Sequence, residues 1–89
     1  MKIHFTDDRK TIGYNAVTDT AVILTEDKDR MKELARSLRG TNDKSRKQRE
    51  ERKFHDEMAS RYGKTVAGEL LFRLWTATKE IYNDEENLH

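Results

Sequence analysis

The chain has 89 residues, of which 34% are hydrophobic and 39% are charged, and its formal net charge is +1. A domain of this size buries only roughly 60–65% of its surface, so a deep enzyme cleft is not expected. The absence of cysteine excludes a disulfide framework and thiolate chemistry.

No targeting or membrane segment is predicted. The charged start lacks the apolar core of a signal peptide, and the longest apolar run, 21–24, is too short to cross a membrane. We find no internal repeat and no linker. We therefore expect one cytoplasmic domain, residues 1–89, with no membrane partner.

The small net charge hides three regions of different sign. Residues 1–27 carry a charge of −2, and residues 65–89 carry −3. Residues 28–64 have thirteen lysines and arginines against seven acidic residues, which gives +6. A basic middle can attract an acidic partner, or it can be neutralised when the acidic ends fold over it.

Residues 2–25 have the pattern of β-strands. Apolar and polar residues alternate in 2–5 and 11–17, and 20–25 is rich in β-branched residues. We predict a small three-stranded antiparallel sheet. The third strand is apolar on both faces, so we expect it to be central or covered on both sides.

A helix over 26–39 is predicted next. Thr25 can act as its N-cap, and Gly40 ends it. Its apolar residues have the i, i+3, i+4, i+7 spacing of one helix face: Met31, Leu34, Ala35 and Leu38.

A second helix over 42–62 begins with a segment that cannot join a core. Residues 41–53 contain no apolar side chain, and we expect them to form a charged, solvent-exposed helical arm. The last two turns of the helix carry Phe54, Met58 and Tyr62 on one stripe, and Gly63 ends it.

The third helix is predicted over 65–83, and a frayed acidic tail over 84–89. Its apolar face spans about half of the circumference, which suggests contact with two other elements or with a second copy in a homodimer. Phe72 lies outside this face and is a candidate exposed aromatic at an interface. The face itself consists of Ala67, Leu70, Leu71, Leu74, Trp75, Thr78, Ile81 and Tyr82.

No motif supports catalysis, a metal or a cofactor. His4, His55 and His89 have no second metal ligand at i+3 or i+4. Residues 63–65 look like the end of a phosphate-binding loop, but the position of that motif's first glycine holds Met58. We therefore predict a binding protein and not an enzyme.

The basic segment has three open interpretations: nucleic-acid binding, protein binding, or a plain solvated helix. Clustered cations gain affinity for phosphates by counterion release. The same residues also form i, i+4 pairs of opposite charge, of which Arg46–Glu50 and Lys53–Glu57 are two, as in a self-neutralising helix. Arg46, Arg49 and Lys53 share one helix face.

Our first hypothesis is a small, non-catalytic regulatory protein that binds the backbone of RNA or DNA. The alternative is a stoichiometric protein inhibitor or adaptor, of the kind that phages encode, which binds an acidic surface of a host enzyme or defence protein. Both hypotheses use the same cations: Lys44, Arg46, Lys47, Arg49, Arg52 and Lys53, extended by Arg36, Arg39 and Lys64.

Overall fold

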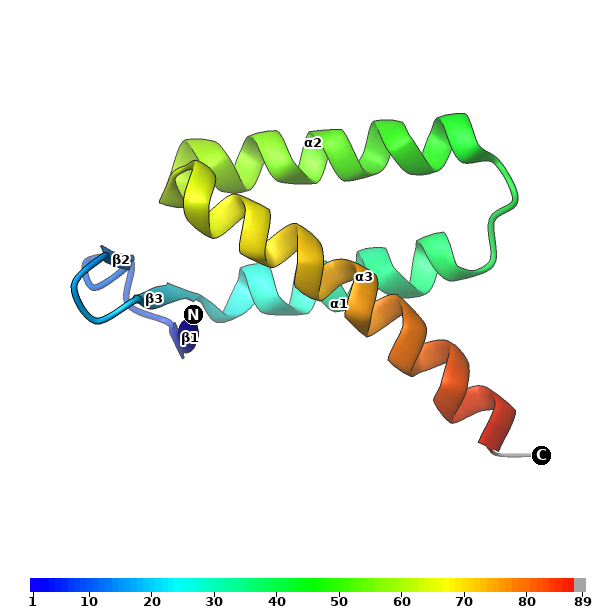
Figure 1. The fold of residues 1–89 in the computed structure, drawn as a ribbon, viewed down its shortest axis with the longest axis horizontal. Coiled ribbons are helices and arrows are strands. Elements are labelled where there is room, and N and C mark those ends of the chain that lie inside the picture. The colour runs from blue at the N-terminus through cyan, green and yellow to red at the C-terminus, as the bar shows by residue number, and fades with distance from the viewer. Residues whose placement is uncertain (88–89) are drawn as a thin grey trace.

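The computed structural model describes the backbone of residues 1–87 and the side chains of residues 1–76. Three strands are followed by three helices, which confirms the predicted α+β fold (Figure 1). The elements are β1 (Lys2–Thr6), β2 (Gly13–Asn15), β3 (Thr20–Leu24), α1 (Thr25–Arg39), α2 (Lys44–Tyr62) and α3 (Lys64–Asn87).

The sheet is mixed, so the predicted antiparallel pairing is wrong for one of its two pairs. β3 lies in the centre, as expected, and the strand order is β1-β3-β2. β2 is antiparallel to β3, whereas β1 is parallel to it, with Ile3 opposite Ala21 and Phe5 opposite Ile23. Only β3 is apolar on both faces, which suits the central position. β1 and β2 lie on either side of it and run in opposite directions.

Helices cover one face of the sheet. Ala21 and Ile23 point into the core between the sheet and the helices and are fully buried. Val22, on the opposite face, is half-buried and lines an open hollow with Thr18 and Thr20. β3 is therefore the central strand, but helices cover only one of its two apolar faces.

The core is completed by α3, which packs against both α1 and α2 (Figure 1). Ala67, Leu70 and Leu74 of its predicted apolar face are buried, as is Val66 beside them, whereas Leu71 is half-buried. The apolar face of α3 therefore packs against two other elements of the same chain, which is one of the two arrangements that its width suggested. The predicted homodimer stays a prediction, and the side chains of Thr78, Ile81 and Tyr82 lie outside the described residues.

The helix ends differ slightly from the predicted ones. Leu24 and not Thr25 is the N-cap of α1, and it makes no side-chain capping hydrogen bond. Asp43 caps α2 by accepting a hydrogen bond from the backbone N–H of Arg46 at 3.0 Å. α3 continues through residues 84–87, and the rest of the predicted tail, 88–89, lies outside the described residues.

No helix in the described part of the chain is both long enough and apolar enough to span a membrane.

Candidate nucleic-acid interface

α2 is half anchored and half exposed. Phe54, Met58 and Tyr62 in its second half are buried in the core. In its first half, 44–53, every side chain is exposed except those of Glu50 and Glu51, which are half-buried. The charged segment therefore belongs to a helix whose last turns pack on the domain.

A buried polar network fixes the anchored end. The carboxylate of Asp27 is 4% exposed and accepts hydrogen bonds from Arg61 Nη1 at 2.5 and 2.6 Å. The hydroxyl of Tyr62 donates to the same carboxylate and accepts from the backbone N–H of Leu24 at 2.9 Å. Burial, reinforced by the hydrogen bond to Asp27, raises the pKa of Tyr62 to about 12.

By its place in the chain, Asp27 is an acid in the first turn of α1, where a negative charge is favourable. Its position held more information, because it lies four residues before Met31 and therefore on the apolar face of α1. An acidic residue on a buried face needs hydrogen-bond partners, and Arg61 and Tyr62 supply them.

The acidic and basic side chains of α2 have different surroundings. Glu51 accepts a hydrogen bond from Trp75 Nε1 on α3 at 3.1 Å, and Glu57 pairs with Arg30 on α1. Both carboxylates are half-buried between helices. In contrast, all six predicted cations are exposed: Lys44, Arg46, Lys47, Arg49, Arg52 and Lys53.

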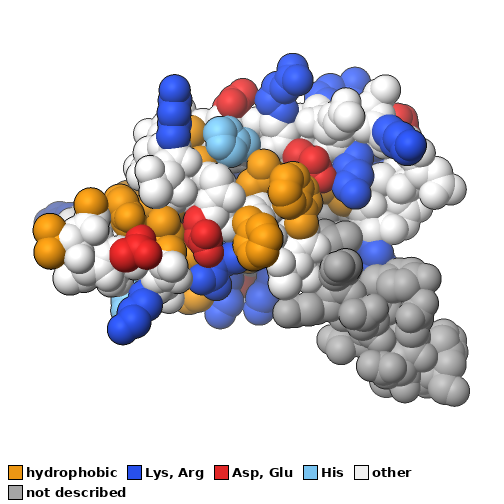
Figure 2. Space-filling view, viewed as in Figure 1, with side chains coloured by type: hydrophobic (Ala, Val, Ile, Leu, Met, Phe, Trp, Pro, Cys, Tyr) orange, Lys and Arg blue, Asp and Glu red, His pale blue; other side chains and the backbone are white. Residues whose placement is uncertain are grey.

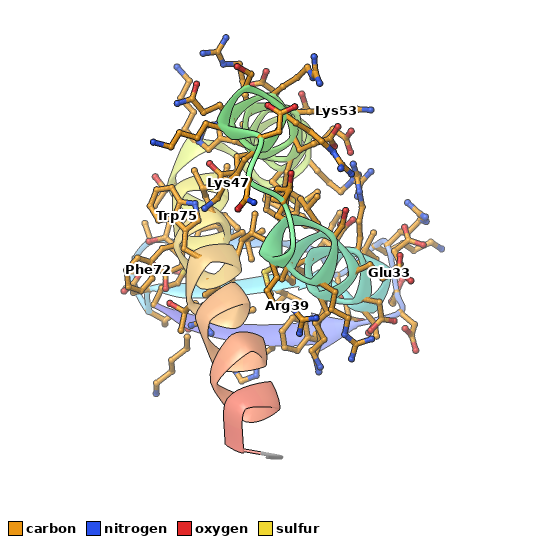
Figure 3. The ribbon with its side chains drawn as sticks, turned by 90° about the vertical axis from the view of Figure 1, so that its right-hand side faces the viewer. Glu33, Arg39, Lys47, Lys53, Phe72 and Trp75 are labelled. Atoms are coloured by element: carbon orange, nitrogen blue, oxygen red, sulfur yellow. The ribbon has the colours of Figure 1, made fainter. Side chains whose placement is uncertain are left out.

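These six cations surround the helix, and Arg46, Arg49 and Lys53 share one face of it, as their spacing predicts. Lys47 lies on the same side of the molecule as Trp75, whereas Lys53 points away from it (Figure 3). Arg46 reaches α1, where its Nη2 donates to Ser37 Oγ at 3.4 Å. Lys53 lines a hollow with Arg30 and Glu33. The predicted face of Arg46, Arg49 and Lys53 therefore borders α1.

The three additional cations fall at different places. Arg36, which is exposed, and Arg39, which is half-buried, lie in the last turn of α1, which leads directly into the exposed end of α2. Arg39 points away from α2 in Figure 3. Lys64 lies beyond the anchored end of α2, and roughly 27 Å separates the two ends of this helix. The structure therefore does not bring Lys64 together with Lys44.

Two aromatic side chains extend this surface. Phe72 is 60% exposed, as expected, although its role at an interface stays a prediction. Trp75 was expected in the apolar face of α3, but it is 49% exposed. It lies at the edge of that broad face, where the indole N–H can reach Glu51. Both side chains lie on the side of the molecule that faces the viewer in Figures 1 and 2.

That side combines apolar and positive groups. Figure 2 shows an apolar patch near its middle, with lysine and arginine side chains along the upper edge over α2.

Next to Phe72, β1, α1 and α3 enclose an open groove of about 450 Å³. Lys28 Nζ lies 4.6 Å from the centre of the Phe5 ring in this groove. The groove depends on packing between segments that are distant in the chain, so no local sequence pattern predicts it. Its lining includes Ile3, Phe5, Met31, Leu70 and Phe72, with Lys28, Lys32, Glu69 and Arg73 as charged members.

The histidines form no acid–base or metal constellation within residues 1–76. His55 Nδ1 lies 3.9 Å from Asp56 Oδ1, beyond hydrogen-bonding distance, and Asp56 is largely exposed. No group of three histidine or acidic side chains in the described residues could hold a metal ion. His89 lies outside those residues.

Comparison with known proteins leaves the geometry of the site as the basis for its interpretation: no protein-family model, no curated protein and no solved structure matches this chain.

Proposed function

We propose that this protein is a small, non-catalytic, cytoplasmic regulatory protein that binds RNA or DNA through the exposed half of α2. One observation carries the proposal. The acidic side chains of Glu51 and Glu57 are engaged by neighbouring helices, whereas the six cations of 44–53 are all exposed, although Arg46 also donates to Ser37. This arrangement favours a positive surface over a self-neutralising helix.

Such a surface suits phosphates. Lysine and arginine side chains that contact a nucleic-acid backbone displace condensed counterions, and this displacement gives affinity without reading the base sequence. Cations that surround an exposed helix can meet the phosphates of a strand from several directions. Arg36 and Arg39 extend the positive region onto the end of α1, whereas Lys64 lies apart from it.

The test is the salt dependence of oligonucleotide binding. The double variant R49Q/R52Q removes two exposed cations without touching the core. If both contact phosphates, the slope of log K against log salt should fall by about 1.4–1.8 between about 50 and 200 mM salt. The matched control is R9Q/K10Q, which removes two exposed cations from the loop between β1 and β2 and should leave the slope unchanged.

The proposal is rejected if wild-type protein shows no binding to single- or double-stranded RNA or DNA at low salt, where phosphate contacts are strongest.

The groove beside Phe72 favours a second candidate, a stoichiometric inhibitor or adaptor that binds an acidic protein surface. Exposed apolar area in a concave site is typical of protein interfaces, and Lys28, Lys32 and Arg73 would complement acidic residues on the partner. A pull-down with nuclease treatment separates the two candidates. A partner retained after digestion supports the inhibitor or adaptor, and a partner lost after digestion supports nucleic acid.

A further inference from the structure

We infer that the nucleic acid is single-stranded and that its bases stack on Trp75 and Phe72. This inference rests on the proposed function and names the ligand class of the same surface. The observation behind it is a pair of exposed aromatic rings beside a cationic helix, of which Trp75 is held by a hydrogen bond.

The two rings are exposed on one side of α3. Phe72 is 60% exposed and Trp75 is 49% exposed, and they are three residues apart on the helix. Covering the exposed part of a large aromatic ring is favourable. The pair therefore offers two apolar ring surfaces that a ligand can cover.

Trp75 is held in place. Its Nε1 donates to Glu51 Oε1 at 3.1 Å, which joins α3 to α2 and fixes the orientation of the indole. The polar edge of the ring is thereby satisfied, while about half of the side chain stays exposed. A ring that is already oriented loses little conformational entropy when a base stacks on it.

Positive side chains flank the pair in two directions. Lys47 on α2 lies on the same side as Trp75 and Phe72 (Figure 3). Beyond Phe72, the groove carries Lys28 and Lys32, whereas its third cation, Arg73, is paired with Glu69 and donates to the carbonyl of Met1. A strand that lies across the aromatic pair would therefore meet cations for its phosphates at both ends, as in proteins that combine stacking with backbone contacts.

Duplexes cannot use this arrangement. Their base faces are covered by neighbouring pairs, and exposing them costs unstacking energy. An unpaired strand can turn its bases onto aromatic rings without breaking pairs. The stacking surface therefore selects single strands, while the cations of α2 attract both forms.

The experiment uses fluorescein-labelled oligo(dT) and oligo(rU) of about 15 nucleotides, a length in the range that such surfaces occupy, and a duplex of equal length. Trp75 is the only tryptophan, so its fluorescence reports stacking directly. We expect the unlabelled single strands to quench this fluorescence and to bind more tightly than the duplex.

Two variants test the rings separately. W75L should weaken single-strand binding by roughly 5- to 150-fold, the size of one lost base stack, and leave the salt slope unchanged because no phosphate contact is lost. F72L keeps the tryptophan reporter and should also weaken binding. V17S is the control, because Val17 is 95% exposed in the turn between β2 and β3. Equal melting temperatures would show that all three variants fold.

The inference is overturned if the duplex binds as tightly as the single strands, if bound oligonucleotide leaves the tryptophan fluorescence unchanged, or if W75L and F72L bind within about twofold of wild type. In these cases an effect of R49Q/R52Q on the salt slope would still support the proposed function. Failure of every oligonucleotide to bind would reject both.

Discussion

Tyr62 donates its hydroxyl hydrogen to Asp27, although 35 residues separate the two along the chain. Both side chains are buried, and the same hydroxyl accepts a hydrogen bond from the backbone N–H of Leu24. The contact joins the end of α2 to the junction of β3 and α1. It therefore holds the anchored half of the charged helix on the domain.

Removing this hydroxyl should destabilise the fold. Y62F leaves the buried N–H of Leu24 without its partner and removes one of the hydrogen bonds to Asp27, whose two oxygens still accept from Arg61, so we expect a loss of about 1–3 kcal/mol in the free energy of unfolding. Urea denaturation measures it. The matched control is Y14F, whose hydroxyl bonds the exposed Asp19 at 2.7 Å and should matter less. Equal stability of Y62F and wild type would contradict the assigned role of the network.

Alkaline pH should act through the same residue. The pKa of Tyr62 is raised from 10.0 to about 12 in the folded protein, so folding favours its neutral form. The contribution of Tyr62 is therefore fully present below pH 10 and is lost as the pH rises toward 12. Urea midpoints measured across this window should fall for wild type. They should fall less for Y62F, and parallel decreases would show that another group is responsible.

Truncation of the central leucine of α3 should be costly. Leu74 is fully buried, so L74A should lower the free energy of unfolding by roughly 2–5 kcal/mol through lost burial and a residual cavity. L71A, at a half-buried position on the same helix, should cost less. Thermal or urea unfolding compares the two, and a smaller loss for L74A than for L71A would place the core elsewhere.

Neutralising an inward-facing acid should strengthen nucleic-acid binding. E51Q keeps an oxygen that can accept the hydrogen bond of Trp75 and removes a negative charge beside the cations of α2. We expect an affinity gain of a few fold at low salt that fades as salt rises. D7N, an exposed change in the loop after β1, is the control. A gain of equal size in D7N would indicate a general effect of net charge.

A test of the non-catalytic assignment uses the histidines. H4A and H55A should leave any biological effect within a few fold of wild type. Removal of a catalytic acid or base typically costs about a hundredfold or more. A loss of that size in a folded variant would identify an active site.

The sequence predicted the order of elements because each has a clear local pattern. Residues 20–25 are apolar and β-branched, and Met31, Leu34 and Leu38 repeat at helical spacing. The parallel pairing of β1 was missed, since alternation along a strand determines its faces and not its neighbours.

The candidate site was predicted less completely. The six cations of 44–53 followed directly from composition, and their exposure from the lack of apolar residues. Which acids turn inward depended on where α1 and α3 lie beside α2, and periodicity within one helix carries no such information. The exposure of Trp75 was missed for the same reason.

The unequal anchoring of α2 divides one continuous helix into two parts of different local stability. Amide hydrogens in 54–62 lie beside the buried network and should exchange with solvent only when the domain opens widely. Amides in 44–53 have few tertiary contacts to break, so fraying from the Asp43 cap should expose them sooner. A ligand bound to the cations of 44–53 would add its binding free energy to every opening that breaks this site, whether by local fraying or by opening of the whole domain. Binding should therefore slow exchange in 44–53 below the rate set by fraying of the free protein, without any change in the fold.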